Sequence, residues 1–237
     1  MEGDGHPLEE LLSRNEELPR EEPEVSRNIG EQLKHMDLTS WPVTLRRRAR
    51  DLVARKEPTT VVEVGAGIGH LSSWLFDHWT TGGKQPARYQ LVEEGGKFGV
   101  ILKRVIDRYE AHDWAEVVIG DWNSIVSDSK AWHAANATDQ AATGAGKSPL
   151  PKSIDLIILQ SDHSRLLERL MASMPLLTKK GLLITAEPEV PMGEDADQAQ
   201  VDSFNQWMEF IKMIQSSHEV GFVPMYGGTL VGITRKS

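Results

Sequence analysis

Residues 61–71 read VVEVGAGIGHL, in which an apolar run carries one acid and is followed by glycines at every second position. The valines predict a strand of a parallel sheet covered on both faces, because such strands are almost continuously apolar. Glycines directly after a strand allow a sharp turn and a close approach to the backbone. The apolar residues of segment 70–78 fit the start of a helix. A strand, a glycine loop and a helix together predict a site where free backbone N–H groups face a ligand.

Strands and helices alternate along the rest of the chain. Further strands are predicted at 88–94, 115–121, 153–160 and 181–187, and helices at 96–111, 164–177 and 200–217. Two final strands, 218–226 and 229–237, are joined through Gly227 and Gly228. Alternation of this kind implies βαβ units, and the closing hairpin adds an antiparallel edge. We therefore expect an α/β fold, a Rossmann-like three-layer αβα sandwich whose seven-stranded sheet is mostly parallel and ends in a C-terminal antiparallel hairpin.

The composition indicates one soluble domain. A chain of 237 residues is long enough for a single sizeable core. No apolar run approaches the roughly 18 residues that a membrane span needs, and the first residues lack the layout of a secretory signal. The absence of cysteine excludes disulfides, thiolate metal sites and a cysteine nucleophile. We expect a cytoplasmic protein with no membrane partner.

The net charge of -9 is concentrated at the N-terminus. Residues 1–25 hold nine acids and two arginines, so the remaining residues, 26–237, are close to neutral. A polar, charged leader of this kind is typical of a flexible segment. We therefore expect an acidic flexible tail over 1–25 and one folded domain over 26–237.

The first part of that domain, residues 26–56, is predicted to be helical with a break near Trp41–Pro42, because proline disfavours helix in the residue before it. The segment carries four arginines that fall mostly outside its apolar face: Arg46, Arg47, Arg48 and Arg50. Charge runs usually face water, so we expect a solvated helix face. A phosphate-binding patch is the alternative.

One stretch does not fit the alternation of strands and helices. Residues 127–152 are rich in Ala, Ser, Thr and Gly and end near two prolines. Part of the stretch, around 131–142, has helical composition. We expect a surface insertion between the third and fourth strands, of a length at which loops also serve as lids.

The spacing of the glycines distinguishes two classes of cofactor. A dinucleotide fingerprint, G-x-G-x-x-G, needs a third glycine for close helix–strand packing, and His70 stands at that position. The spacing instead resembles the E/D-x-G-x-G-x-G motif of class I S-adenosylmethionine-dependent methyltransferases. The resemblance implies that the amino-acid end of the cofactor lies across the glycine turn, with Glu63 orienting it directly or through water. The implied turn residues are Gly65, Ala66, Gly67 and Gly69.

Later strand ends add to this resemblance. Glu93 ends the second strand, 24 residues after Gly69, where an acid can accept both ribose hydroxyls. Because strand side chains alternate, only one of Glu93 and Glu94 faces the ligand, and the family register favours Glu93. After the third strand, the motif matches a position whose acid accepts from the adenine amino group; the matching residues are Gly120, Asp121 and Trp122. Gln160, at the end of the fourth strand, completes the expected cofactor site.

Residues 26–237 resemble more narrowly the small O-methyltransferases related to catechol and caffeoyl-coenzyme A O-methyltransferases, whose closing hairpin is similar to HEVGFVPMYGGTLVGITRK. In that group, the fourth strand ends in a metal-binding Asp, a Lys three positions later acts as the base, and the fifth strand ends in Asp-Asn, which supply two more ligands to magnesium. Here Gln160 stands at the first metal position, His163 at the lysine position, and Glu187 with Pro188 at Asp-Asn. Magnesium prefers hard oxygen ligands, so we expect no metal, although Asp162 could rescue a site.

The implied reaction is an in-line transfer of a methyl group to an oxygen or nitrogen atom of a small molecule. Histidine can remove a proton near neutral pH, so His163 is the first candidate base, with Asp162 and Glu187 as alternatives. Walls are expected from the helices near Trp41, from residues 187–192, and from Trp207 or Tyr226.

Three other functions stay open: an RNA, DNA or protein methyltransferase, a degenerate cofactor-binding subunit, and, more distantly, a NAD-linked oxidoreductase. The partner is expected to be a small molecule. Nucleic acid is not favoured, because LQSD (159–162) stands where amino-methylating nucleic-acid enzymes carry a [DNS]-P-P-[FYW] motif. A homodimer also stays open.

Overall fold

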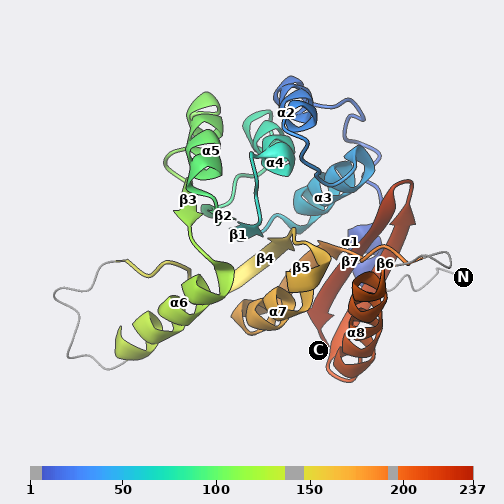
Figure 1. The fold of residues 1–237 in the computed structure, drawn as a ribbon. Coiled ribbons are helices and arrows are strands. Elements are labelled where there is room, and N and C mark those ends of the chain that lie inside the picture. Colours follow the sequence, from blue (N-terminus) through green and yellow to red (C-terminus); the bar gives the residue numbers. More distant parts are fainter. Residues whose placement is uncertain (1–6, 137–146, 192–196, 237) are drawn as a thin grey trace, which may run out of the picture.

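A computed structural model describes residues 7–136, 147–191 and 197–236, and it contains one twisted sheet between two helical layers (Figure 1). The strands follow the order β3-β2-β1-β4-β5-β7-β6. The first five are mutually parallel, and β7 runs antiparallel to both β5 and β6. The strands are β1 (Thr60–Val64), β2 (Arg88–Glu93), β3 (Ala115–Ile119), β4 (Ile154–Leu159), β5 (Leu177–Ala186), β6 (His218–Met225) and β7 (Gly228–Arg235). The predicted fold class is confirmed.

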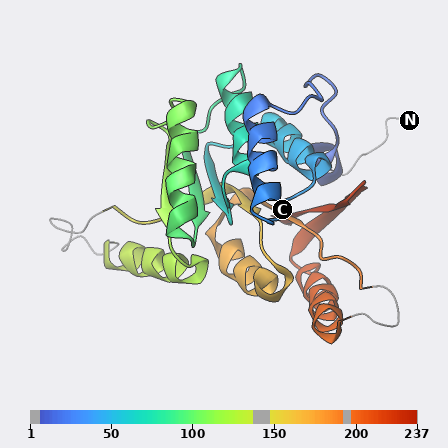
Figure 2. The same cartoon turned by 45° about the horizontal axis from the view of Figure 1, so that its top comes forward.

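The helices cover both faces of the sheet. Figures 1 and 2 show α2 to α5 on one face, with α2 beside α4, and α6 to α8 on the other. Alternate residues of β1 therefore enter two separate cores: Val61 packs with the first layer, and Val62 and Val64 with the second. The helices are α1 (Pro7–Leu12), α2 (Glu24–His35), α3 (Val43–Lys56), α4 (His70–Thr80), α5 (Gly96–Arg108), α6 (Trp122–Asn136), α7 (His163–Ser173) and α8 (Gln198–Ile214), with a 3-10 turn η1 at Met174–Leu176.

Several local predictions agree closely with this structure. The helical region 26–56 breaks between α2 and α3, and Pro42 stands directly before α3. The hairpin β6–β7 turns through the predicted glycine pair, of which Gly227 has a positive φ of 89°. Strand β5 begins earlier than expected, at Leu177, because the chain leaves α7 through the turn η1. Within the described ranges, no helix has the length and apolar character that a membrane crossing requires.

The expectation of a flexible tail over 1–25 is wrong for residues 7–25; residues 1–6 lie outside the described ranges. Leu12 is fully buried and Leu8 is 4% exposed, both against the hairpin β6–β7. A Cβ atom at Gly221 would lie 2.7 Å from Leu12 Cδ1, so the hairpin has no room for a larger residue there. Leu8 and Leu12 pack inward and Glu22 pairs with the buried Arg46, while Glu9, Glu10, Glu16 and Glu17 are exposed; charge composition alone does not reveal this division.

Three of the four arginines predicted as a solvated face of α3 are engaged within the domain and are not free to form a phosphate patch: Arg46, Arg48 and Arg50. Arg46 and Arg50 are 6% and 5% exposed. Arg48 donates to the carbonyl of Leu12 at 2.9 Å, and Arg50 donates to the carbonyl of Pro19 at 2.8 Å. These three arginines thus fasten the N-terminal segment to α3, which corrects the sequence interpretation for them.

The prediction of a surface insertion over residues 127–152 is also partly wrong. Residues 127–136 continue α6, residues 137–146 lie outside the described ranges, and Leu150 returns to the core with no exposed surface. The backbone N–H of Leu150 donates to Ser129 Oγ at 3.0 Å, which ties the return segment to α6. Three alanines of the stretch, Ala131, Ala134 and Ala135, belong to the last turns of α6.

Candidate functional site

A cavity of about 720 Å³ lies at the carboxyl ends of the parallel strands, within the size range of small-molecule sites. The carboxyl ends of β1, β2, β3 and β4 meet at one edge, so the residues that follow them share this cavity. The α2–α3 connector, the start of α7 and the β6–β7 turn close its other sides. Its walls include most of the predicted cofactor residues: Gly65, Ala66, Gly67, Glu93, Gly120, Trp122 and Gln160.

The glycine loop is shaped by two different constraints. A Cβ atom at Gly65 would lie 2.1 Å from the carbonyl oxygen of Gln160, so the loop can approach β4 only without a side chain. Gly69 has a φ of +89° and abuts Leu102 and Val105 of α5, and it does not line the cavity. The structure therefore places Gly65 to Gly67 at the ligand space and Gly69 in the packing behind it.

Glu63 lies beneath the loop and does not reach the cavity. Its side chain is fully buried and accepts from Ser72 Oγ at 3.0 Å, from Gln160 Nε2 at 2.8 Å and from the hydroxyl of Tyr89. Burial raises the pKa of Glu63 from 4.5 to about 7, against the effect of these donors. Glu63 therefore does not line the cavity, whereas Gln160, which donates to Glu63, does.

Glu93 and Glu94 have different surroundings. One oxygen of Glu93 accepts from the N–H of Gly67 at 2.8 Å, and the other accepts from the N–H of Gly95 at 3.0 Å. Glu94 instead pairs with two arginines of α7: Arg165 at 2.8 Å, and Arg169. Glu93 is hydrogen-bonded to the glycine loop, and among the described residues it has no cationic partner. Both features favour Glu93 over Glu94 as the acid that binds the ligand.

Asp121 serves mainly as the N-terminal cap of α6. Its Oδ1 accepts from the N–H of Ser124 at 3.0 Å, and its Oδ2 accepts from Arg165 at 2.7 Å. The bond from Ser124 N and the nearby guanidinium together lower the pKa of Asp121. Trp122 borders the cavity but is 1% exposed and donates to Ser173 Oγ, so it belongs largely to the core.

The residues after β4 lie together on the cavity wall. Asp162 caps α7 and accepts from Ser164 Oγ at 2.6 Å and from the N–H of Arg165 at 3.0 Å. Burial alone would raise the pKa of Asp162, but these two donors outweigh it and lower the pKa. His163 begins α7 with an exposed side chain that borders the cavity. Ser161 Oγ is buried and has no hydrogen-bond partner in the described ranges, so it is a polar group left for a ligand.

The donors expected for magnesium do not assemble here. Gln160 uses its amide N–H to bind Glu63, and Asp162 uses its carboxylate to cap a helix. Glu187 borders the cavity, where Trp207 Nε1 lies 3.4 Å from its Oε1. Within the described ranges, no three histidine or acidic side chains are grouped closely enough to hold a metal ion. The chemistry of this donor set does not fit a divalent metal.

Two predicted wall residues are misplaced, and two real ones were missed. Trp207 is fully buried and does not line the cavity, although it donates to Glu187, which does. Tyr226 is 93% exposed at the turn, where only the neighbouring glycines reach the wall. Trp41 does line the cavity, together with Ser40 and His70. Ser40 and Arg165 carried no sequence signal, because their partners lie 30 to 71 residues away.

Comparison with known proteins gives structural matches only. No protein-family model matches the sequence, and no curated protein matches it. The O-methyltransferase TomG from Streptomyces achromogenes, involved in tomaymycin synthesis and solved with SAM, is 13% identical, with a TM-score of 0.67 and 92% of each chain covered. The SAH-bound methyltransferase PaMTH1 from Podospora anserina is 12% identical, with a TM-score of 0.66 and 91% of this chain and 89% of that chain covered.

A third solved structure, the O-methyltransferase from Bacillus cereus in complex with SAH, is 15% identical, with a TM-score of 0.64 and 91% of this chain and 92% of that chain covered. These identities are low, so the matches establish a shared fold over nearly the whole chain. The residues of the site itself must carry any conclusion about function.

Proposed function

We propose that this protein is an S-adenosylmethionine-dependent methyltransferase that acts on an oxygen or nitrogen atom of a small molecule without a catalytic metal. The observation that carries the proposal is the pairing of the glycine loop with Glu93. Gly67 N–H and the Glu93 carboxylate meet at the carboxyl edge of β1 and β2, inside a cavity large enough for a cofactor and a small acceptor.

The described residues fit the cofactor. Glu93 has lone pairs available for ribose hydroxyls, and Ser161 Oγ is an unsatisfied buried group on the same cavity wall. Gly65 and Gly67 leave backbone at the cavity where side chains would otherwise stand. When bound, S-adenosylmethionine supplies an electrophilic methyl group on a sulfonium. The fold of the solved methyltransferases in complex with SAM or SAH supports this choice.

The acceptor would lie between the α2–α3 connector and the residues after β4 and β5. Leu33, Trp41 and Pro42 offer an apolar wall, and His163 and Glu187 border the same cavity. Asp162 is already engaged as a helix cap, so His163 and Glu187 remain as bases that could take the acceptor's proton. Catalysis then rests on holding the acceptor in line, which is a large effect in itself.

Calorimetric titration with S-adenosylhomocysteine tests the proposal, with NAD as the competing cofactor. We expect binding of S-adenosylhomocysteine and none of NAD. Glu93→Gln should weaken binding by about 10- to 100-fold, because hydrogen bonds to a charged acceptor are worth about 1.5–3 kcal/mol. The matched variant Glu94→Gln should change affinity less than threefold. Binding of NAD alone would overturn the assignment.

A cofactor-binding subunit without catalysis is a second candidate, favoured by the unusual donors after β4 and β5. One experiment distinguishes methyl transfer from cofactor binding without catalysis. The protein is incubated with S-adenosylmethionine and a panel of phenols and amines, and release of S-adenosylhomocysteine is followed. Tight cofactor binding with no release on any acceptor would favour the subunit.

A further inference from the structure

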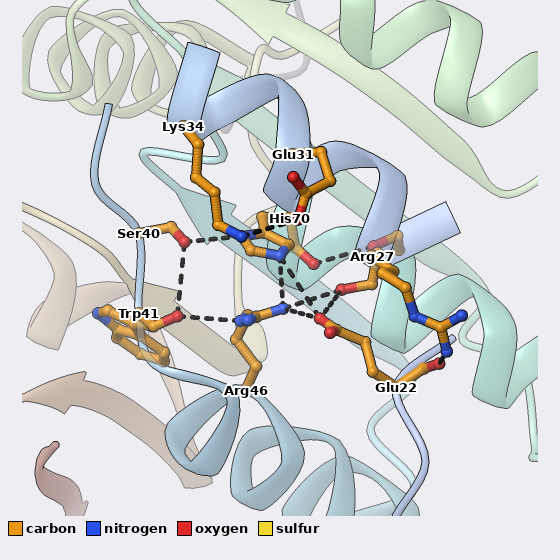
Figure 3. A network of polar contacts seen from close by, with 10 residues as sticks. Glu22, Arg27, Glu31, Lys34, Ser40, Trp41, Arg46 and His70 are labelled. Carbon is orange, nitrogen blue, oxygen red and sulfur yellow. Dashed lines mark hydrogen bonds and ion pairs between the residues drawn. The ribbon is translucent and has the colours of Figure 1, made fainter. Parts of the chain in front are cut away.

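A buried polar cluster connects the N-terminal segment, the glycine loop and the cavity wall (Figure 3). Its centre is Arg46, whose Nη1 lies 2.7 Å from Glu22 Oε1, 2.8 Å from Ser26 Oγ and 2.6 Å from His70 Nε2. Arg46 Nε also donates to the carbonyl of Trp41 at 2.9 Å. None of these residues belongs to the set expected to hold the cofactor, although Trp41 and His70 line the cavity.

The contacts fix the protonation state of His70. A guanidinium only donates, so His70 Nε2 must accept from Arg46. The proton of the neutral ring is therefore on Nδ1, which donates to Ser40 Oγ at 2.6 Å. Burial, followed by the charge of Arg46, lowers the pKa of His70 to about 4, while Glu22 opposes the shift. His70 is thus a directional link from Arg46 to Ser40 at neutral pH.

His70 is also joined mechanically to the glycine loop. It directly follows Gly69, and its carbonyl accepts from Ser73 Oγ in the first turn of α4. On its other side, a Cβ atom at Gly30 would lie 3.3 Å from His70 Nε2, so α2 presses closely on the ring. The ring therefore has little freedom to turn independently of the loop that precedes it.

The α2–α3 connector depends on this cluster for its position. Within the described ranges, Thr39, Ser40 and Trp41 make no hydrogen bond between backbone groups. The contacts that hold Ser40 and Trp41 are the side-chain bonds from His70 and Arg46, respectively. Ser40 is thus attached to the start of α4, and Trp41, which also packs against the apolar core, is attached through Arg46 to α3. Because Arg46 also contacts His70, both attachments meet at the same histidine.

We propose that His70 is a positioning residue that couples the glycine loop to the wall formed by Ser40 and Trp41, so that cofactor binding sets the shape of the acceptor pocket. The inference rests on the proposed function. Coupling of this kind needs one element that both sites bias, and the His70–Ser40 bond is that element. Loss of the bond should free the wall while leaving the loop intact.

The test is ¹⁹F NMR of protein labelled with 5-fluorotryptophan, with the Trp41 resonance assigned from Trp41→Phe. Without ligand, Ser40→Ala should shift or broaden the Trp41 resonance, whereas Ser40→Thr, which keeps the hydroxyl, should resemble the wild type. Ser216→Ala, which removes a serine hydrogen bond at the exposed end of α8, is the matched control. An unchanged Trp41 resonance in folded Ser40→Ala would overturn the proposal whatever the protein binds.

The second arm adds S-adenosylhomocysteine. In the wild type we expect the Trp41 resonance to shift on binding, and in Ser40→Ala we expect that shift to be lost. Affinity should fall no more than about 10-fold, the equivalent of one hydrogen bond. The same Trp41 shift in wild type and Ser40→Ala would refute the coupling. Absence of any binding to wild-type protein would instead refute the proposed function, while the first arm still decides whether Ser40 positions Trp41.

Discussion

At the scale of single residues, Glu63 shows how a buried acid can support a site that it does not enter. Three donors surround its carboxyl group, and the residue has no exposed surface. The energetic cost of ionising it there explains why its pKa is raised to about 7. Through Gln160, the group helps to fix the end of β4 beside the glycine loop.

Glu63→Gln should change how stability depends on pH. Between pH 4.5 and about 7, the folded protein holds a proton on Glu63 that the unfolded chain has lost, so this residue makes stability fall as pH rises. The effect amounts to about 3 kcal/mol over that window. Urea unfolding at pH 5 and pH 7.5 should show that the variant lacks this fall relative to the wild type. Parallel curves for the two proteins would contradict the raised pKa.

The variant His163→Ala tests whether His163 is the base that removes the proton of the methyl acceptor. General-base catalysis is typically worth about 10²–10⁴-fold, so kcat should fall by that factor on any acceptor that the wild type methylates. Titration with S-adenosylhomocysteine should give a near wild-type affinity, because the cofactor contacts lie elsewhere. His35→Ala, at the exposed end of α2, is the control. An undiminished kcat would transfer the role to Glu187.

At the scale of elements, the N-terminal segment behaves as part of the domain. Helix α1 has only six residues and would not persist alone, so its stability must come from packing. Arg55 donates to the carbonyls of Ser13 and Arg14, and the N–H of Asn15 donates to Asp51 at 3.1 Å. The N-terminal segment is thus held to α3 through its backbone groups. Every sequence has these groups, so the amino-acid composition of the segment does not indicate that it is held.

Leu12→Ala should therefore lower the free energy of unfolding by about 2–4 kcal/mol, the usual cost of removing a buried leucine side chain. Leu11→Ala, at a half-buried neighbour, should cost clearly less. Chemical denaturation of both variants measures the difference. Equal and small effects would mean that α1 does not pack against the hairpin in solution.

At the scale of the whole molecule, the sequence predicted features that depend on the periodicity of apolar residues. It did not predict contacts between residues that are far apart in the chain. The valines of β1 and the apolar spacing of α5 predicted the layers. The choice of Glu93 over Glu94 rested on the family resemblance, and both acids border the cavity. The cavity wall formed by Ser40 and Trp41 could not be predicted in this way. Ser40 and His70 are 30 residues apart, and they meet because α2 packs against α4. The exposure of the arginines was predicted wrongly for the same reason: Arg46 and Arg48 bind groups 24 and 36 residues away in the chain.

The distribution of charge also bears on nucleic acid as a substrate. Binding to phosphates draws on arginines that can release counterions, and its strength falls steeply with salt. On α3, Arg46 is paired with Glu22 and Arg50 with Asp51. Arg48 donates to the backbone carbonyl of Leu12. The full chain carries a net charge of -9. The molecule therefore lacks a free basic face on this helix.

We expect no measurable binding of a single-stranded RNA 20-mer at 0.15 M salt, and at most weak binding at 0.05 M, by fluorescence anisotropy. Arg47 is the member of the α3 group whose Nε has no hydrogen-bond partner among the described residues, so Arg47→Glu is the informative variant. Arg104→Glu, on the exposed face of α5, is its matched control. A submicromolar complex at 0.15 M salt that Arg47→Glu weakens and Arg104→Glu does not would make α3 a phosphate-binding surface. In that case the acceptor would have to be sought among nucleic acids, and the apolar wall at Trp41 would need another explanation.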